Sequence, residues 1–184
     1  MPMKAVKQFH ASSSGISGQA PSLPLRQILI VPTDSLKDFN LNAQDLRCNV
    51  VLDWKGLHDL NSGTILLMGE VKVRLTFHCE SCDQLRPAVD PKKIAHRRGF
   101  LGQILSEGII SVGDHVEIDP NRMEPIPFNP TERIEWFLKR SEEKLTAVNL
   151  LSEIGFSRSY CRVLPRWLEP LPDALRNRIV WSSK

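Results

Sequence analysis

The most regular pattern in the chain is an alternation of apolar and polar side chains over residues 71–77. Its apolar members are Val71, Val73, Leu75 and Phe77. A period of two is typical of a strand with one buried face. Apolar runs at residues 27–31, 47–52 and 64–68 also have the length of strands. We therefore predict a mainly β domain over the first part of the chain.

Turn signals separate these runs. Gly69-Glu70 lies between two of them at hairpin spacing, and Gly113-Asp114 comes shortly before Val116-Glu-Ile. The first 25 residues are rich in Ser, Gly and Pro, and we expect one short early strand and a loop there. Short strands at such spacing favour a barrel or a strongly bent sheet.

A proline-rich segment divides the chain. Pro125, Pro127 and Pro130 exclude regular helix or a central strand around them. The predicted parts are a β domain at residues 1–119 with its core at 25–119, a linker at 120–130 and a helical domain at 131–184.

The hydrophobic period changes from that of a strand to that of a helix after this segment. Asn129 and Pro130 are typical of the cap and first position of a helix. A second helix is predicted over residues 146–154, before Gly155, and a third from Ser157. The core of this small domain is expected to contain three tryptophans, Trp136, Trp167 and Trp181.

The composition is that of an ordinary soluble globular protein, since 41% of the 184 residues are hydrophobic and 24% are charged. No apolar run approaches the roughly 18 to 20 residues that span a bilayer, and no apolar segment follows the N-terminal lysines as in a secretion signal. We therefore expect a cytoplasmic protein with reduced cysteines and no membrane partner. The net charge is +3, and the basic excess lies at residues 155–184, with six basic and two acidic side chains.

Cys79 and Cys82 form a C-x-x-C pair at the end of the alternating strand. Two thiols at this spacing suit a soft metal ion, a redox disulfide or a persulfide carrier. No second paired motif accompanies Cys48 and Cys161, which disfavours structural zinc, and the pair closes a strand instead of opening a helix, which disfavours a thioredoxin-like site. Cys79 can equally be a packing residue. The polar loop at residues 83–93 places Cys82 nearer the surface, where a thiolate can react.

Several motifs, taken in order, resemble the MOSC domain, the module named after the C-terminus of molybdenum cofactor sulfurases. They are Asp45-Leu-Arg-Cys-Asn-Val-Val, the segment 60–76, Cys79-Glu-Ser-Cys-Asp-Gln-Leu and the segment 96–116, which begins His96-Arg-Arg-Gly. The resemblance covers about residues 25–119. It implies a MOSC-type β-barrel with a pocket that binds the molybdenum–pterin cofactor (molybdopterin) or carries sulfur to it through one essential cysteine.

By its place in the motif, the resemblance assigns the essential cysteine to Cys82, which would also be the thiolate ligand of molybdenum. Arg97 and Arg98 are its basic partners, because a guanidinium can hold the phosphate of a pterin cofactor with two hydrogen bonds; they can equally be a solvated surface pair. Arg47 and Asn49 stand in the Arg-Glu-Asn stretch of the family, where this chain has a cysteine in place of the Glu. The His-Gly motif that many longer MOSC proteins carry is not apparent before residue 25.

The C-terminal part resembles the winged-helix, DNA-binding half of the alkylguanine DNA alkyltransferases and their alkyltransferase-like relatives. The similar segments begin at Thr131, Thr146, Arg158 and Pro170, within residues 128–182. The reactive Pro-Cys-His-Arg of the alkyltransferases falls on Leu175-Arg-Asn-Arg. Because the methyl-accepting thiol and its His are absent, alkyl transfer is excluded at that position.

Arginines recur at every fourth position in this region. Arg158, Arg162 and Arg166 would share one face of a continuous helix, although Pro165 is expected to kink or end that helix at Leu164. On that face they could meet the phosphates of DNA, or they could form a solvated surface.

Two hypotheses from different classes follow. In the first, the protein binds molybdopterin or carries its sulfur through Cys82, either as a component of a molybdenum-dependent reductase or as a sulfur-transfer protein. It then needs a redox partner or a sulfur-donor protein, because no glycine-rich dinucleotide fingerprint follows any strand. Pyridoxal phosphate is not expected, since its chemistry belongs to another domain of the full-length sulfurases. In the second hypothesis the barrel is a silent scaffold, and the C-terminal helix-turn-helix binds DNA or a protein.

Overall fold

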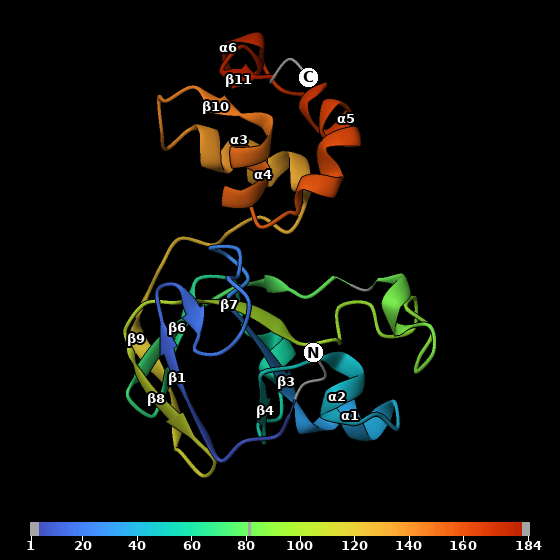
Figure 1. The fold of residues 1–184 in the computed structure, drawn as a ribbon, viewed down its shortest axis with the longest axis vertical. Helices are drawn as coiled ribbons and strands as arrows, with labels where there is room; N and C mark the ends of the chain where they lie inside the picture. Colours follow the sequence, from blue (N-terminus) through green and yellow to red (C-terminus); the bar gives the residue numbers. More distant parts are fainter. Residues whose placement is uncertain (1–3, 81, 182–184) are drawn as a thin grey trace. The chain divides into compact units, whose positions relative to one another are not determined.

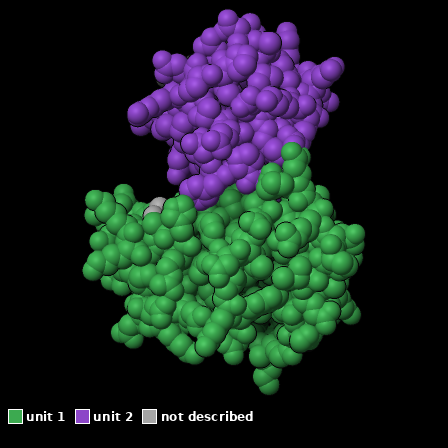
Figure 2. All heavy atoms as spheres, turned by 180° about the vertical axis from the view of Figure 1, so that it is seen from behind, with its two compact units in different colours: residues 1–22, 26–125 green, residues 23–25, 126–184 purple. Residues whose placement is uncertain are grey.

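The computed structural model describes residues 4–80 and 82–181. The chain divides into two compact units (Figures 1 and 2). Unit 1 comprises residues 1–22 and 26–125, and unit 2 comprises residues 23–25 and 126–184. The division after residue 125 falls in the segment where three prolines interrupt regular structure.

Unit 1 is built from two sheets. The larger one has six strands, in the order β4 (Val50–Leu52), β3 (Ile28–Pro32), β7 (Phe100–Ile104), β6 (Val71–His78), β5 (Thr64–Met68) and β9 (Val116–Arg122). The smaller one has the order β2 (Gly15–Ile16), β1 (Gln8–Ser12) and β8 (Gly108–Ser111). All pairs are antiparallel except β3 with β4. The larger sheet curls into a half-barrel (Figure 1), which agrees with the predicted mainly β fold.

Residues from both sheets pack into one hydrophobic core. Ala11 and Ile110 come from the smaller sheet, while Ile30, Leu66 and Leu75 come from the larger one, and each is at most 5% exposed. The strand at residues 71–77 is confirmed as β6, but of its three alternating polar positions only Lys72 is exposed as the alternation predicts. Arg74 and Thr76 are buried, because the curled sheet and the chain at Glu124 cover that face; the Arg74 guanidinium donates to the Glu124 carbonyl at 2.6 Å.

One irregularity in the β6–β7 ladder decides where side chains point near the end of β6. Leu75 pairs with Gly102 and His78 pairs with Phe100, so β6 has one residue more than β7 between these two pairs. An extra residue reverses the alternation of faces beyond it. His78 therefore lies on the same side as the core residue Phe100, while Phe77 and Cys79 lie on the other side.

Short helices join the strands at the same end of unit 1. They are α1 (Thr33–Asp38), α2 (Ala43–Leu46) and the 3₁₀ turns η1 (Leu57–Asp59) and η2 (Asp83–Leu85). The strand predicted at residues 47–52 begins only at Val50, because Arg47 has a left-handed backbone (φ 53°) as the C-cap of α2. The amide of Asn42 closes a capping box at the other end of this helix, which holds the short turn in place.

Unit 2 is mainly helical. Its elements are α3 (Pro130–Leu138), β10 (Leu145–Thr146), α4 (Ala147–Glu153), η3 (Arg158–Arg162), α5 (Leu164–Leu168), α6 (Asp173–Arg176) and β11 (Ile179–Val180). The predicted start of the first helix is confirmed, since the Asn129 side chain accepts from the amides of Thr131 and Glu132. The predicted second helix is confirmed as α4, with Gly155 following it in the left-handed region (φ 81°).

Two expectations for unit 2 are wrong. The arginines at residues 158–166 do not lie on a continuous helix, because a 3₁₀ helix ends at Arg162 and α5 starts anew at Leu164, just before Pro165. Trp181 is not a core residue, since it is 49% exposed. The core is mainly aliphatic, with Ile134, Leu150 and Leu164 fully buried; Phe156 is its buried aromatic member, and Trp167 packs against it from a partly buried position.

We expect Gly99, between the site residue Arg98 and β7, to tolerate no side chain. Its φ is +116°, and a Cβ there would stand 2.4 Å from the Ile30 carbonyl oxygen. Strain and overpacking together predict that Gly99→Ala lowers the free energy of unfolding by roughly 3 kcal/mol.

The matched control is Gly18→Ala. Gly18 also has a positive φ (+78°), but no heavy atom lies within 4 Å of its added Cβ, so we expect a loss of only about 1 kcal/mol. Chemical denaturation followed by circular dichroism measures both, and equal losses would contradict the close approach of β7 to β3.

Candidate functional site

The structure brings Cys82 and Arg98 together at the end of the β6–β7 ladder. The guanidinium of Arg98 donates to the Cys82 Sγ at 3.6 Å, to the Glu80 carbonyl at 2.8 Å and to the Leu46 carbonyl at 3.5 Å. Its Nε is buried and has no hydrogen-bond partner in residues 4–80 and 82–181. Arg98 thus connects the end of α2 to the cysteine segment, and its Nε–H remains available as a hydrogen-bond donor. We call the group Cys82, Arg98, Glu80 and Arg26 the sulfur site.

Arg26 and Glu80 complete the sulfur site beside Cys79. The Arg26 guanidinium forms an ion pair with the Glu80 carboxylate and lies 5.7 Å above the Phe77 ring. The position of Phe77 and Cys79 on one face of the bulged strand explains why both meet Arg26. Both charged side chains are largely covered, with 24% and 29% of their surfaces exposed, so their pairing is screened less than that of surface ions.

The two thiols of the C-x-x-C pair have different environments. Cys79 is 4% exposed, and burial raises the pKa of its thiol despite the nearby charges of Arg98 and Arg26. Cys82 is partly exposed and accepts from a guanidinium. Cys79 is therefore suited to packing, and Cys82 has the access that a metal ligand or sulfur carrier requires. Cys48, the departure from the family pattern, is also buried, and burial raises the pKa of its thiol to about 11.

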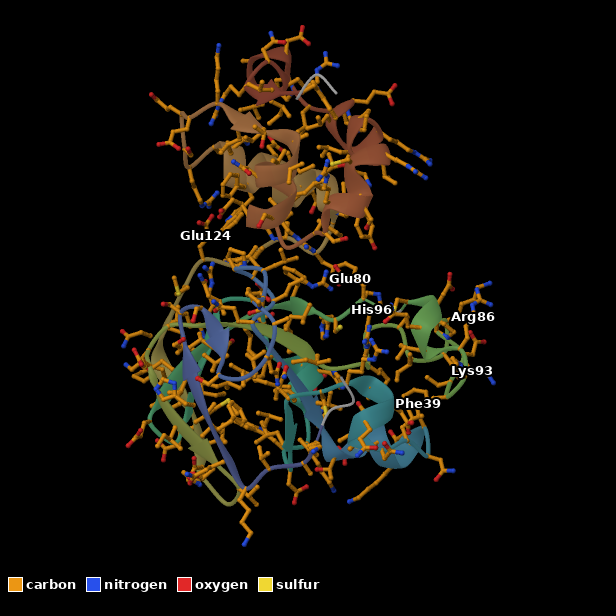
Figure 3. All side chains as sticks on the ribbon, in the orientation of Figure 1. Phe39, Glu80, Arg86, Lys93, His96 and Glu124 are labelled. Atoms are coloured by element: carbon orange, nitrogen blue, oxygen red, sulfur yellow. The ribbon has the colours of Figure 1, made fainter. Side chains whose placement is uncertain are left out.

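Arg47 lies close to the cysteine segment. Its guanidinium donates to the Gln84 side chain at 3.1 Å, and Gln84 belongs to η2, which begins directly after Cys82. The loop that continues from η2 carries Arg86 and Lys93, both exposed (Figure 3). Arg86 is paired with Asp83 at 2.8 Å, so the basic residue that the structure places on the border of the sulfur site is Arg47, which would favour an anionic ligand there.

Arg97 and Asn49, the other two predicted site residues, have different contacts. Arg97 forms an ion pair with Asp38 and lies 5.3 Å above the Phe39 ring, both at the C-terminal end of α1. The Asn49 amide accepts from the Leu29 backbone at 2.7 Å, so it extends the pairing of β3 with β4. Of the five candidates at this end of unit 1, the structure groups Cys82, Arg98 and Arg47.

Sequence reasoning missed the two charged partners Arg26 and Glu80. They stand 54 positions apart in the chain, and Arg26 lies in a segment without a motif of its own. The one available signal was the position of Glu80 inside the C-x-x-C pair, which by itself does not indicate a counter-charge.

Three histidines gather on the opposite face of the same ladder. The His78 ring centroid lies 5.8 Å from that of His58, 5.9 Å from that of His96 and 4.2 Å from that of Phe100. They come from three segments, namely η1, the end of β6 and the loop before β7. Figure 3 labels His96 on that loop. We call these three residues the histidine cluster.

The hydrogen bonds around His58 define its tautomer. The buried hydroxyl of Ser35 lies 2.7 Å from the Arg97 carbonyl, which can only accept, and 2.8 Å from the His58 Nε2. The single hydroxyl proton is therefore given to the carbonyl, and Nε2–H donates to Ser35. Ser35 consequently cannot act as a nucleophile activated by His58, because its proton is already committed and its side chain is buried.

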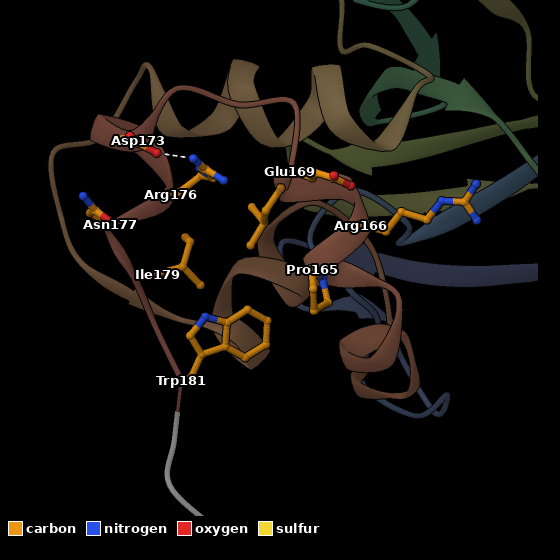
Figure 4. A pocket seen from close by; sticks show the side chains of 9 residues that line it. Pro165, Arg166, Glu169, Asp173, Arg176, Asn177, Ile179 and Trp181 are labelled. Carbon is orange, nitrogen blue, oxygen red and sulfur yellow. Dashed lines mark hydrogen bonds and ion pairs between the residues drawn. The ribbon is translucent and has the colours of Figure 1, made fainter.

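The predicted nucleic-acid residues Arg158, Arg162 and Arg166 are all exposed. Arg166 also lines an open groove in unit 2, together with the exposed Trp181 and the ion pair of Arg176 with Asp173 (Figure 4). The remaining lining residues are Pro165, Leu168, Glu169, Asn177 and Ile179. The groove thus has mixed charge, and its acidic side chains would oppose a polyanion there.

Within residues 4–80 and 82–181, no group of three His, Cys, Asp or Glu side chains could hold a metal ion. The same part of the chain has no helix long and apolar enough to cross a membrane.

Comparisons with known proteins bear on the fold. No protein-family description and no curated protein matches the sequence. Among solved structures, YiiM from Escherichia coli is similar with a TM-score of 0.54 at 17% identity, covering 95% of this chain and 92% of that one. YiiM from Geobacillus stearothermophilus is similar with a TM-score of 0.51 at 16% identity, covering 79% and 80%. YUAD from Bacillus subtilis is similar with a TM-score of 0.54 at 15% identity, covering 62% and 86%.

YiiM is a MOSC-domain protein, so these likenesses identify the fold of this chain as MOSC-like. Because the similarity to E. coli YiiM covers 95% of the chain, it includes most of unit 2 as well. The similarity of unit 2 to the alkyltransferases, with its winged helix and helix-turn-helix, stays a prediction.

The histidine cluster predicts a pH dependence of stability. Burial, with the neighbouring rings of His58 and His96, lowers the pKa of His78 from 6.5 to about 4. The unfolded chain binds a proton below about pH 6.5 whereas the folded chain does not, so stability falls as the pH drops from 6.5 to about 4. His78→Gln should lose roughly 1 kcal/mol less between pH 7 and pH 5 than the wild type, after allowance for solvent screening.

Urea denaturation at several pH values measures this difference. Between about pH 7 and 8 the two proteins should show the same pH dependence, since His78 is neutral in both states there. An acid response that is unchanged in His78→Gln would show that the ring is not held neutral in the folded protein.

Proposed function

We propose that the protein binds the molybdenum–pterin cofactor, or carries its sulfur, through the thiolate of Cys82. The observation that supports this most is the contact between Cys82 and Arg98 at the covered end of the β6–β7 ladder. A thiolate is a soft donor that suits molybdenum, and a guanidinium is the side chain best matched to a phosphate. The MOSC-like fold is consistent with this proposal.

The residues of the sulfur site fit such a group in their chemistry. Cys82 supplies a partly exposed sulfur, and the buried Nε of Arg98 has a proton without a partner in the described chain. Arg47, exposed on the same border, would hold the anionic end of the pterin with Arg98. When bound, molybdenum supplies two-electron redox chemistry. The chain itself would bind and orient the group, and the Arg26–Glu80 pair would hold Arg98 and the cysteine segment in place.

Sulfur carriage would use the same residues with another partner. Cys82 thiolate would attack the outer sulfur of a donor protein's persulfide, so that one S–S bond forms at Cys82 while the donor's S–S bond breaks and the donor leaves as a thiolate. Arg98 would stay within reach of the negative charge on the new terminal sulfur. Reduction of a substrate would instead require a separate electron-donor protein.

Cys82→Ala should abolish the binding of molybdenum and pterin, measured per chain by elemental analysis and fluorescence on protein prepared anaerobically from a host that makes the cofactor. Arg98→Lys should retain less than half, since a point charge replaces the two-pronged donor. For sulfur carriage, the corresponding measurement is a mass increase of one sulfur on Cys82 after incubation with a persulfide donor.

Cys79→Ala is the matched control, because Cys79 is buried and its removal leaves the Cys82 thiol in place. This variant should keep most of the molybdenum or the added sulfur. Equal loss from both cysteine variants would contradict the assignment to Cys82 and favour a site made of both thiols.

A second proposed function is nucleic-acid binding by unit 2. It is supported by the exposure of Arg158, Arg162 and Arg166, none of which has an acidic partner in the described part of the chain. Their positions on two successive short helices spread the three charges along one segment. Such a segment would contact the phosphate backbone without reading its sequence.

The double variant Arg158→Gln/Arg162→Gln should weaken binding to duplex DNA about tenfold at low salt and reduce the slope of affinity against salt by roughly two. Fluorescence anisotropy measures both quantities. Lys139→Gln/Arg140→Gln, at the C-cap of α3 and the position after it, is the control and should change affinity less. The absence of binding by the wild type at low salt would remove this function.

A further inference from the structure

Three aromatic rings of unit 2 form a cluster that reaches from its core to its surface. The ring centroids of Phe156 and Tyr160 lie 5.0 Å apart, those of Phe156 and Trp167 lie 4.8 Å apart, and those of Tyr160 and Trp167 lie 5.7 Å apart. Phe156 is 5% exposed, Trp167 is partly buried and Tyr160 is 42% exposed. We call these three residues the aromatic cluster.

The Tyr160 ring is held in place by the rest of the cluster. Its plane is within 24° of that of the Trp167 indole, against which it is stacked. Phe156 in turn lies under the guanidinium of Arg133, at 5.1 Å, and this fully buried arginine donates to three backbone carbonyls. A surface ring supported in this way loses little conformational freedom when a ligand stacks on it.

Two arginines stand on either side of this ring. Tyr160 lies in the middle of the 3₁₀ helix η3, and Arg158 and Arg162 are each two positions away from it. With three residues per turn, their side chains leave the helix about 120° to either side of Tyr160, and their backbones are about 8 Å apart along the axis. Both arginines are exposed, and no carboxylate in the described chain is paired with either.

Val163 extends the apolar part of this surface. It is 40% exposed and follows Tyr160 by three positions, which in a 3₁₀ turn is the same face. We call Arg158, Tyr160, Arg162 and Val163 the η3 surface. It therefore consists of an apolar face, with a supported aromatic ring, between two cations.

The chemistry of the η3 surface matches a single strand of nucleic acid. Its two cations complement the phosphates that repeat along such a strand, and its ring offers a stacking face to a base between them. In a duplex both faces of each base are covered by neighbouring base pairs. A ring on the protein surface can therefore stack only on an unpaired base.

We infer that unit 2 binds single-stranded nucleic acid at the η3 surface, with an unpaired base stacked on Tyr160 and adjacent phosphates held by Arg158 and Arg162. This inference rests on the proposed nucleic-acid function and specifies the substrate of that function. Every base has a π face, so binding is expected to depend little on sequence.

The test compares a labelled single-stranded oligonucleotide of about 12 nucleotides with a duplex of the same sequence, by fluorescence anisotropy on the full chain at low salt. The wild type should bind the single strand about tenfold more tightly than the duplex. Tyr160→Leu keeps an apolar side chain against Trp167 but has no π face. It should weaken single-strand binding about tenfold and change duplex binding less than about twofold. Tyr160→Phe should bind as the wild type does.

Trp181→Ala is the matched control, because Trp181 is an aromatic residue of similar exposure (49%) outside the aromatic cluster. It should bind the single strand as the wild type does, and circular dichroism checks that each variant is folded. The inference is overturned if the wild type does not prefer the single strand, if Tyr160→Leu binds it normally, or if Trp181→Ala loses as much affinity.

The two forms of nucleic acid also separate this inference from the function on which it rests. Duplex binding that weakens in Arg158→Gln/Arg162→Gln, together with single-strand binding that does not respond to Tyr160→Leu, would overturn the stacking inference alone. The absence of binding to either form at low salt would remove both.

Discussion

The pairing of β6 with β7, with one extra residue on β6, is the constraint on which the rest of the site depends. Before the irregularity, Leu75 faces the core of unit 1, and beyond it His78 does so in place of Phe77. Without the extra residue, Cys79 would face the core side and the histidine would face Arg26. A single insertion therefore assigns the thiols and the imidazoles to different faces of the same strand end.

The loop that returns to β7 is divided between the same two faces. Arg98 contacts Cys82 and the Glu80 carbonyl, while its neighbour Arg97 contacts Asp38 and Phe39 of the α1 segment. Arg97 lies in a turn and Arg98 in the bend that follows it, so the two side chains diverge where the chain changes direction before β7. Gly99 allows the loop to approach β3, because a side chain at this position would collide with the Ile30 carbonyl. The two arginines are adjacent in sequence, but their side chains contact different parts of unit 1.

Much of the fold could be predicted from local patterns. The strands at β3, β5 and β6, the hairpin between the last two and the capped start of α3 all follow from spacing and turn chemistry that act over a few residues. The helices α1 and α2 were not predicted, because their six and four residues are too short for a clear period. The extra residue in β6 was not predicted either, since the alternation of Val71 to Phe77 runs through it without interruption.

By itself, the sequence determined that a mainly β part precedes a helical part, and that Cys82 lies beside a polar loop where a thiol can be reached. These features depend on the order of neighbouring residues. Only the tertiary structure decided that Arg98 contacts Cys82, that Arg26 and Glu80 pair beside it, and that three histidines meet on the other face. Such contacts join segments far apart in the chain, and they arise from sheet register and from an irregularity in one ladder, which no local pattern encodes.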